Sequence, residues 1–181
     1  MDGGQITKIL SSLPETFPLF NGVYTNSKIP DLFLSSVNGF IIANTLSGSE
    51  TDKGIGHWVS LVCRDGVLYF LDSFAMHPSV YKGEIYRIFS SYLGDKKVVF
   101  ESPLQSPNSY VCGAYTVYFS YMMCINRSVY EIKMKFSVNK KCNDKFVRKF
   151  IMKLTGTSVK CNSEFCPAYM FMTNCSKRCS C

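Results

Sequence analysis

The stretch from Cys112 to Cys124 constrains the fold more than any other part of the chain. It reads Cys-Gly-Ala-Tyr-Thr-Val-Tyr-Phe-Ser-Tyr-Met-Met-Cys and is apolar on nearly every side. Such a helix belongs inside a domain, with other elements around it. Pro107 and Asn108 are turn residues, and Asn108 or Ser109 can cap the helix. The sequence therefore predicts a loop that ends in a cysteine at the first turn of a buried helix.

Cys112 is a candidate nucleophile because of this position. Backbone N–H groups in the first turn and the helix dipole favour a thiolate. The same N–H groups can hold a developing oxyanion, and Gln105, seven residues earlier, can add a side-chain amide donor. An isolated cysteine is more often a small buried hydrophobe, so the interpretation depends on partners elsewhere in the chain.

The partners come from a predicted β-hairpin. The chain has two histidines. His57 opens an apolar strand, and Asp72 follows the next strand, with the Asp65–Gly66 turn between the two strands. The start of one strand and the end of its antiparallel neighbour lie at the same edge of a sheet. His57, Asp72 and Cys112 can thus meet as base, orienting acid and nucleophile.

His77 and Trp58 each have two competing interpretations. His77 follows Asp72 by five residues and precedes a proline, so we interpret it as a loop residue, although it could replace His57 as the base. Trp58 could line a substrate groove beside the base, or it could be a core residue of a buried strand. We expect it to be a supporting residue without a chemical role.

The rest of the pattern predicts one domain of α+β class over residues 1–181. In this interpretation a mixed or antiparallel sheet packs against the buried helix, and further helices lie outside it. Residues 15–38 are rich in turn residues and are expected to be loops, and 47–54 to be a mobile loop. The remaining elements are expected to be helices at 6–13, 79–92 (capped by Ser79) and 143–154 (with Gly156 at its C-terminal cap), and strands at 40–44, 58–63, 67–71 and 96–101.

The catalytic motifs resemble those of the adenovirus endopeptidase (adenain) family, within the wider group of SUMO- and ubiquitin-like-specific cysteine proteases. The resemblance is carried by Gly56-His57-Trp58, by Leu71-Asp72-Ser73-Phe74, and by Gln105 to Gly113. Phe20 to Tyr24 with Pro30, and Ala43-Asn44-Thr45 with Glu50-Thr51, are also similar to adenain. Adenovirus enzymes mostly carry Glu as the acid, whereas this chain has Asp72, as the SUMO-protease branch does.

The resemblance implies a papain-like core and a thiol endopeptidase with a Cys112–His57–Asp72 triad and a Gln105 oxyanion hole. It implies cleavage after Gly-Gly or Gly-X-Gly motifs in viral precursor polypeptides, in the virion and in the infected cell (nucleus or cytoplasmic virus factory). No cofactor is needed for the chemistry. An activating viral peptide and DNA are partners of that family. The alternatives are a ubiquitin- or SUMO-like isopeptidase, and a catalytically inactive DNA- or capsid-binding protein.

Positive charge is concentrated in one region. Residues 127–160 hold ten Lys or Arg against two acids, Glu131 and Asp144, a net charge of +8. We expect a basic helical part there, with Val147, Phe150, Ile151 and Leu154 as its apolar stripe. One-sided basic charge gives affinity for nucleic acid without sequence preference, although a solvated helix face explains the same pattern. The candidate DNA contacts are Lys145, Arg148, Lys149 and Lys153.

The last 21 residues, 161–181, form a Cys-rich C-terminal tail with Cys161, Cys166, Cys175, Cys179 and Cys181. The tail contains no Cys-x-x-Cys pair and no histidine, so the spacing does not match a usual zinc site. We expect disulfides within a viral particle or free thiols. No apolar run reaches the roughly 20 residues of a membrane span, and the N-terminus does not resemble a signal peptide. We expect a monomer that has no membrane partner.

Overall fold

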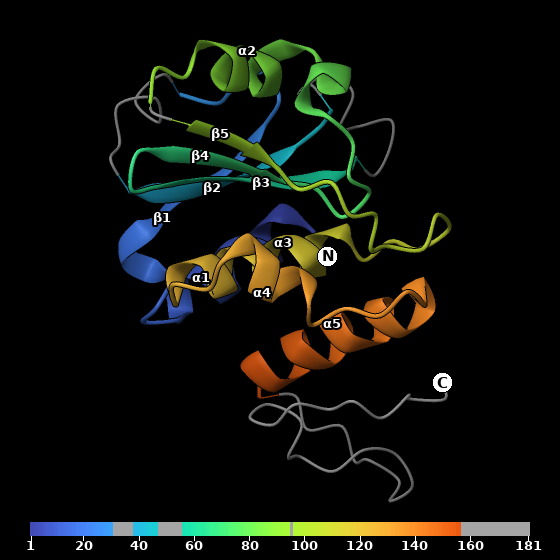
Figure 1. Ribbon diagram of the computed structural model, residues 1–181. Helices are drawn as coiled ribbons and strands as arrows, with labels where there is room; N and C mark the ends of the chain where they lie inside the picture. Colours follow the sequence, from blue (N-terminus) through green and yellow to red (C-terminus); the bar gives the residue numbers. More distant parts are fainter. Residues whose placement is uncertain (31–37, 47–55, 95, 157–181) are drawn as a thin grey trace, which may run out of the picture.

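Five strands form one mixed sheet at the centre of the protein (Figure 1). The computed structural model describes residues 1–30, 38–46, 56–94 and 96–156. The sheet order is β1-β2-β3-β4-β5, with β2/β3 and β3/β4 antiparallel and the two outer pairs parallel. The strands are β1 (Phe20–Thr25), β2 (Gly39–Asn44), β3 (Trp58–Arg64), β4 (Val67–Leu71) and β5 (Lys96–Val99). The predicted α+β class is confirmed.

The β3–β4 hairpin is the element that the sequence predicted best. Asp65 and Gly66 have φ angles of 52° and 74°. Positive φ at both central residues is the type I′ geometry that suits a two-residue hairpin. The register pairs Arg64 with Val67 and Ser60 with Leu71. The start of β3 and the end of β4 therefore share one edge of the sheet.

Helices cover both faces of this sheet (Figure 1). The α2 helix (Gly83–Ser91) lies on one face, and α1 (Gly3–Ser12) and α3 (Cys112–Cys124) lie on the other. Alternate strand residues feed the two cores: Phe40 and Ile42 pack on the α3 side, whereas Ile41 and Ala43 pack on the α2 side. The helices α4 (Val129–Lys133) and α5 (Lys140–Leu154) complete the α3 side, with α5 packed outside α3.

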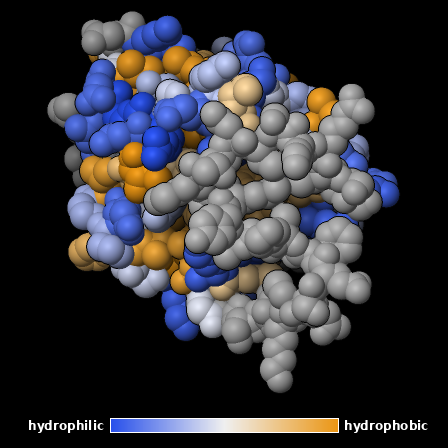
Figure 2. Space-filling model, turned by 60° about the horizontal axis from the view of Figure 1, so that its bottom comes forward, coloured by the Kyte–Doolittle hydropathy of each residue, from blue (hydrophilic) through white to orange (hydrophobic). Residues whose placement is uncertain are grey.

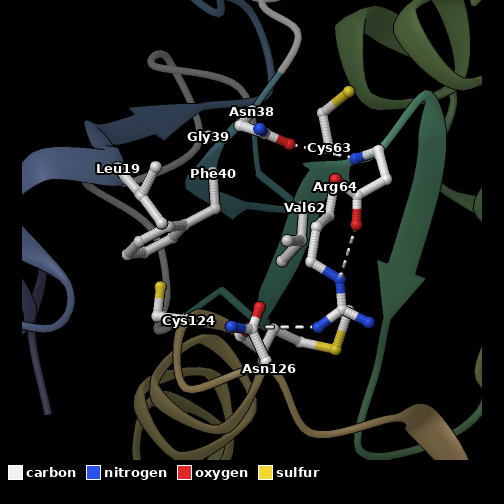
Figure 3. A pocket seen from close by; sticks show the side chains of 11 residues that line it. Leu19, Asn38, Gly39, Phe40, Val62, Cys63, Arg64, Cys124 and Asn126 are labelled. Carbon is white, nitrogen blue, oxygen red and sulfur yellow. Dashed lines mark hydrogen bonds and ion pairs between the residues drawn. The ribbon is translucent and has the colours of Figure 1, made fainter.

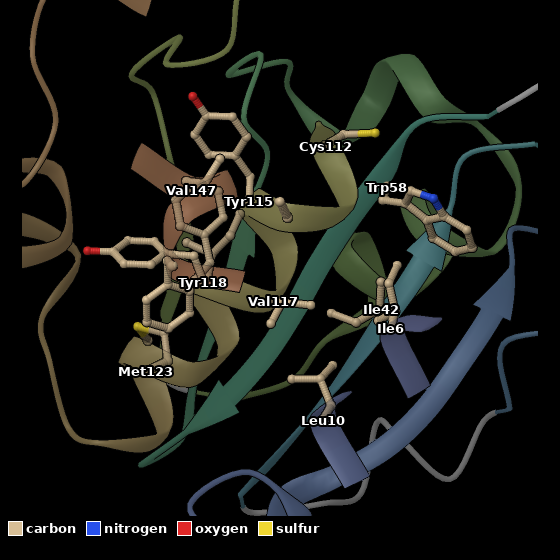
Figure 4. Close-up of a cluster of buried hydrophobic side chains, with 14 of the residues drawn as sticks. Ile6, Leu10, Ile42, Trp58, Cys112, Tyr115, Val117, Tyr118, Met123 and Val147 are labelled. Atoms are coloured by element: carbon tan, nitrogen blue, oxygen red, sulfur yellow. The ribbon is translucent and has the colours of Figure 1, made fainter. Parts of the chain in front are cut away.

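The α3 helix is buried as its sequence predicted. Ten of its 13 residues are buried, and Tyr115, Val117 and Phe119 have no exposed surface. Figure 4 shows its side chains meeting Ile6 and Leu10 of α1, Ile42 of β2 and Val147 of α5. The helix that carries the candidate nucleophile is thus held on several sides.

Four expectations about local structure were wrong. Residues 15–38, expected to be loops, contain β1 and a short 3-10 helix, η1 (Phe17–Leu19). A bulge between Phe20 and Val23, with φ of 116° at Gly22, interrupts the alternating pattern by which a strand is recognised. The cap of α3 is Val111, without a side-chain hydrogen bond, instead of Asn108 or Ser109. The predicted helix at 79–92 is interrupted, because Pro78–Tyr81 form a separate 3-10 helix, η4, and α2 begins at Gly83 with Lys82 as its cap.

The fourth difference is at α5, which begins at Lys140, three residues before the predicted start, because the side chain of Asn139 caps it. Gly156 has the left-handed φ of 65° expected at a helix C-terminus. In the described residues no helix has the length and apolar character needed to cross a membrane. The predicted loop at 47–54 and the cysteines of 161–181 lie outside the described residues.

Candidate active site

His57 is fixed at the edge of the sheet by its own backbone. It directly precedes β3, and its carbonyl accepts the Thr45 N–H at 2.8 Å while its N–H donates to Thr45 Oγ1 at 3.2 Å. The residue before it, Gly56, lies against the buried side chain of Asn44: a Cβ atom at Gly56 would be 1.8 Å from Asn44 Oδ1. Glycine is therefore needed here for the chain to reach the base position.

Asp72 follows β4 and is fully buried. Its Oδ1 accepts from His57 Nε2 at 2.6 Å and from the Phe74 N–H at 2.8 Å. Its Oδ2 accepts from the Met76 N–H at 3.1 Å and from the Tyr81 hydroxyl at 2.5 Å. A buried carboxylate is tolerated when its oxygens are satisfied in this way. The turn after β4 thus holds the Asp72 side chain in place beside the imidazole.

Cys112 is the first residue of α3 and is 8% exposed. Its sulfur faces the His57 side chain and the backbone N–H groups of Trp58 and Gly113. Burial alone would raise the pKa of this thiol. The contacts with His57, its positive charge and the two N–H donors outweigh burial and lower the pKa of Cys112.

The pKa of the His57 imidazole is shifted in the opposite direction, upward. Burial disfavours its charged form, but hydrogen bonds to Asp72 and Cys112, together with their charges, raise the pKa of His57 to about 9. Because Nε2 faces Asp72, Nδ1 is the ring nitrogen left to face Cys112. A lowered thiol pKa next to a raised imidazole pKa favours a thiolate–imidazolium pair near neutral pH.

Two aromatic rings cover the imidazole on the α2 side. The Phe74 ring lies 4.8 Å from the His57 ring and the Tyr81 ring 6.2 Å from it, centroid to centroid. Asn26 holds the chain at Tyr81, since its Nδ2 donates to the Tyr81 carbonyl at 2.7 Å. The imidazole of His57 is therefore flanked by η4 and by the turn that follows β4.

Gln105 lies in the loop that leads into α3 and is 1% exposed. Its Oε1 accepts from the Ser73 hydroxyl at 2.7 Å, and its Nε2 donates to the Ser109 carbonyl at 2.7 Å. The other hydrogen on Nε2 is available for a further acceptor. The side-chain amide is thus held in one orientation in the segment that positions Cys112.

The other predicted candidates lie elsewhere. His77 caps η4, where its Nδ1 meets the Ser79 hydroxyl at 2.7 Å, and the residue is exposed. Trp58 is a core residue on the α3 side of the sheet, and its backbone N–H faces the sulfur of Cys112. The four basic residues Lys145, Arg148, Lys149 and Lys153 are exposed on α5.

The α5 side of the molecule faces the reader in Figure 2, where strongly hydrophilic side chains lie next to apolar ones. In the described residues no group of three or more His, Cys, Asp or Glu side chains could hold a metal ion. The candidate site brings together a thiol, an imidazole, a carboxylate and a side-chain amide.

A small cavity of about 120 Å³ lies at the opposite end of β3 (Figure 3). Arg64 extends through it and donates to the carbonyls of Met123 and Arg127 at 3.1 and 3.2 Å. Carbonyls at a helix C-terminus lack partners within the helix, so Arg64 has a structural role in closing the end of α3. The cavity belongs to this junction and not to the candidate site.

Comparisons with known proteins support the fold. No family model matches the chain, and no curated protein matches it. A solved structure, the ASFV pS273R protease, shares its fold with a TM-score of 0.56 at 12% sequence identity. The match covers 81% of this chain and 65% of the other, so this chain spans less than two thirds of that protein. The chain therefore shares the fold of that protease.

Sequence reasoning missed several residues around the site. Tyr81 was expected to be an apolar helix residue, and Ser73 was only part of a motif. Asp144 was counted as one of two acids in a basic region, yet it is 7% exposed. Its position three residues before Val147, on the buried stripe of α5, was the signal that could have identified it.

Proposed function

We propose that the protein is a thiol endopeptidase. The observation that carries this proposal is the His57–Asp72 hydrogen bond at one edge of the sheet, with the sulfur of Cys112 beside His57 at the start of a buried helix. This arrangement supplies a nucleophile, a proton carrier and an orienting acid. The fold of a viral cysteine protease supports the same class of reaction.

In the proposed mechanism, the Cys112 thiolate attacks the carbonyl carbon of the scissile peptide bond. The oxyanion that forms accepts from the Cys112 backbone N–H and from Gln105 Nε2. The His57 imidazolium then gives its proton to the leaving amine, and a thioester remains on Cys112. Water, deprotonated by His57, attacks this thioester and releases the acid, which restores the thiol. Asp72 keeps Nε2 of the imidazole fixed throughout.

We further propose that the substrates are viral precursor polypeptides cut after Gly-Gly or Gly-X-Gly motifs, as the resemblance to adenain implies. The enzyme would act as a monomer in the virion or infected cell, in the nucleus or a cytoplasmic virus factory. An activating peptide and DNA remain proposed partners. A peptide held by a disulfide would need a cysteine before the Gln105 loop, and the sequence has no cysteine between Cys63 and Cys112. Such a peptide would therefore bind without a disulfide in that segment, or it would use another cysteine.

The test combines thiol labelling with proteolysis. Iodoacetamide at pH 7 should modify Cys112 faster than Cys124, because burial raises the pKa of Cys124 to about 12. Peptide mapping by mass spectrometry identifies the labelled residue. Cys112→Ala should abolish cleavage, whereas the matched control Cys124→Ala, at the far end of the same helix, should retain it. Cleavage that persists in Cys112→Ala would contradict the proposal.

A ubiquitin- or SUMO-like isopeptidase is the second candidate, because the same triad and the Gly-Gly preference fit it. A panel of ubiquitin-like precursors and virion precursor proteins, incubated with the enzyme, distinguishes the two by which set is cut. DNA binding without thiol reactivity or cleavage would instead favour an inactive DNA- or capsid-binding protein.

A further inference from the structure

The amide of Gln105 has only one orientation that its neighbours accept. The Ser73 hydroxyl donates to Oε1 at 2.7 Å, and Nε2 donates to the Ser109 carbonyl at 2.7 Å. If the amide were rotated by 180°, Oε1 would face the Ser109 carbonyl, and two acceptors would meet in a buried place. A buried polar group without a partner costs about 1–3 kcal/mol. The two contacts therefore select one orientation of the amide, which leaves the second N–H of Nε2 for a further acceptor.

Ser73 also holds the backbone of the same loop. Its carbonyl accepts from the N–H groups of Leu104 and Gln105 at 2.9 and 3.0 Å. Ser73 is 1% exposed and directly follows Asp72, whose side chain meets His57. The turn after β4 thus contacts both parts of the site: Asp72 binds the imidazole of His57, and Ser73 binds Gln105.

A second set of contacts reaches the loop from α5. The Asn143 Nδ2 donates to the Leu104 carbonyl at 3.2 Å. Asp144 Oδ1 accepts from the Tyr115 hydroxyl at 3.0 Å and from the Ser106 N–H at 3.4 Å. The Tyr115 hydroxyl is also 3.1 Å from the Leu104 carbonyl, but it has one proton, and the carboxylate is the stronger acceptor.

Asp144 is unusual in its helix, since its nearest neighbours in sequence on α5 include several exposed lysines. A buried carboxylate is costly unless it is hydrogen-bonded. Its partners are a tyrosine of the nucleophile helix and the peptide group that follows Gln105. The α5 helix is therefore attached to the loop directly after the proposed oxyanion donor.

We propose that Ser73 is a positioning residue that fixes the Gln105 amide as an oxyanion donor, and that Asp144, through Tyr115 and Ser106, holds the loop that carries it. This inference rests on the proposed function and extends it to residues that touch no substrate. The hydroxyl of Ser73 acts through its hydrogen bond to Gln105. Its loss should affect the step that builds an oxyanion and leave the reactivity of the thiol unchanged.

A double-mutant cycle measures this dependence. Gln105→Ala should lower kcat for a peptide substrate by about 10²- to 10³-fold, the usual effect of removing one oxyanion donor. Ser73→Ala should lower kcat by about 10- to 100-fold, with KM within about twofold, because the amide becomes free to rotate. The double variant should be no slower than Gln105→Ala, since residues that act through one another are not additive. Ser73→Thr, which keeps the hydroxyl, should recover activity.

The controls separate positioning from general loss of structure. Ser120→Ala removes another fully buried hydroxyl, on α3 against Ser60, and should leave kcat unchanged. Iodoacetamide alkylation of Cys112 builds no oxyanion, so its rate and pH profile should be the same in Ser73→Ala and the wild type. Tyr115→Phe keeps the core ring and tests the α5 contact; we expect a smaller fall in kcat that is again absent in the Gln105→Ala background.

The possible outcomes are distinct. Effects of Ser73→Ala and Gln105→Ala that multiply, or alkylation that slows as much as hydrolysis, would overturn the inference and leave the endopeptidase in place. Unchanged kcat in Ser73→Ala would also overturn the inference without affecting the proposed endopeptidase activity. Absence of hydrolysis by the wild type across all substrates would overturn the proposed function, and the inference with it.

Discussion

The hydroxyl of Tyr81 and the imidazole of His57 bind opposite oxygens of the same buried carboxylate. Tyr81 donates to Oδ2 of Asp72, and His57 Nε2 meets Oδ1. The Tyr81 ring also lies over the imidazole, so one residue contacts both partners. Burial and the charge of Asp72 raise the pKa of Tyr81, which favours the protonated hydroxyl that donates to Asp72.

Tyr81→Phe should therefore destabilise the protein by about 1.5–3 kcal/mol, the range for a hydrogen bond to a charged group. Hydrolysis should fall by about tenfold or less, because Asp72 keeps its other three donors, and tenfold corresponds to ~1.4 kcal/mol. Thermal unfolding and kcat/KM measure the two effects. Tyr86→Phe, on the exposed face of α2, is the matched control and should change neither; equal effects in both variants would contradict a specific role for Tyr81.

The pH dependence of activity should be bell-shaped. Activity rises as Cys112 loses its proton, at a pH below the usual range of a thiol, and falls as the His57 imidazolium loses its proton near pH 9. Both limbs belong to the coupled pair. Asp72→Asn removes the charge that favours the imidazolium and should move the alkaline limb to lower pH. A profile of kcat/KM in which that limb does not move would show that Asp72 does not control His57.

The same raised pKa predicts how stability depends on pH. The folded pKa of His57 is above the unfolded value of about 6.5, so the native state keeps a proton that the unfolded state loses. The stabilisation is complete below about pH 6.5 and is lost as pH rises through about 9. Denaturant unfolding of Cys112→Ala, which removes the titrating thiol and also its contribution to the raised pKa of His57, should show this fall at a lower pH than in the wild type. The double variant Cys112→Ala/His57→Gln should not.

Gly56→Ala should displace the base. The added Cβ would lie 1.8 Å from Asn44 Oδ1 and 2.8 Å from Leu46 Cγ, so the backbone before His57 must move. Overpacking of this kind costs about 1–3 kcal/mol, and hydrolysis should fall together with the melting temperature. Gly4→Ala on α1 is the control: its Cβ meets nothing closer than 3.4 Å, and alanine suits a helix better than glycine. An active and stable Gly56→Ala variant would contradict this account.

The sequence predicted those parts of the site that depend on local rules. The Asp65–Gly66 turn determines the register of β3 and β4, and that register places His57 and Asp72 at one edge. The apolar run after Cys112 predicted a buried helix, and α3 is one. Hairpin geometry and hydrophobic periodicity act over a few residues, so a single sequence is enough to recognise them.

Contacts between distant segments could not be predicted in the same way. The Ser73–Gln105 hydrogen bond joins residues 32 positions apart, and the Tyr115–Asp144 bond joins residues 29 positions apart. No local pattern predicts which polar groups will meet across a fold. The β1 strand was missed because its bulge interrupts the alternation, and the α3 cap because Val111 makes no side-chain hydrogen bond. The roles of Gln105 and of the basic residues stay predictions.

The basic surface of α5 is a separate part of the site prediction. The apolar side of α5, with Val147 and Phe150, belongs to the core on the α3 side, and the four candidate residues are exposed. The helix therefore presents its positive charge away from the core, as a phosphate-binding surface requires. A solvated helix face would look the same, so only the salt dependence of binding separates the two interpretations.

If α5 binds duplex DNA, each neutralised phosphate should contribute about −0.9 to the slope of log K against log salt. Five contacts would give a slope of roughly −4 to −5, and removal of four should flatten it by about three to four. The test is a fluorescence-anisotropy titration at several salt concentrations, with the four candidates Lys145, Arg148, Lys149 and Lys153 changed to Ala. The control removes the same charge from other exposed positions, Lys8, Lys28, Lys96 and Lys97. Because the field of the whole protein also attracts DNA, the control can weaken binding, but its slope should stay near that of the wild type. Equal slopes for all three proteins would exclude α5 as the DNA surface.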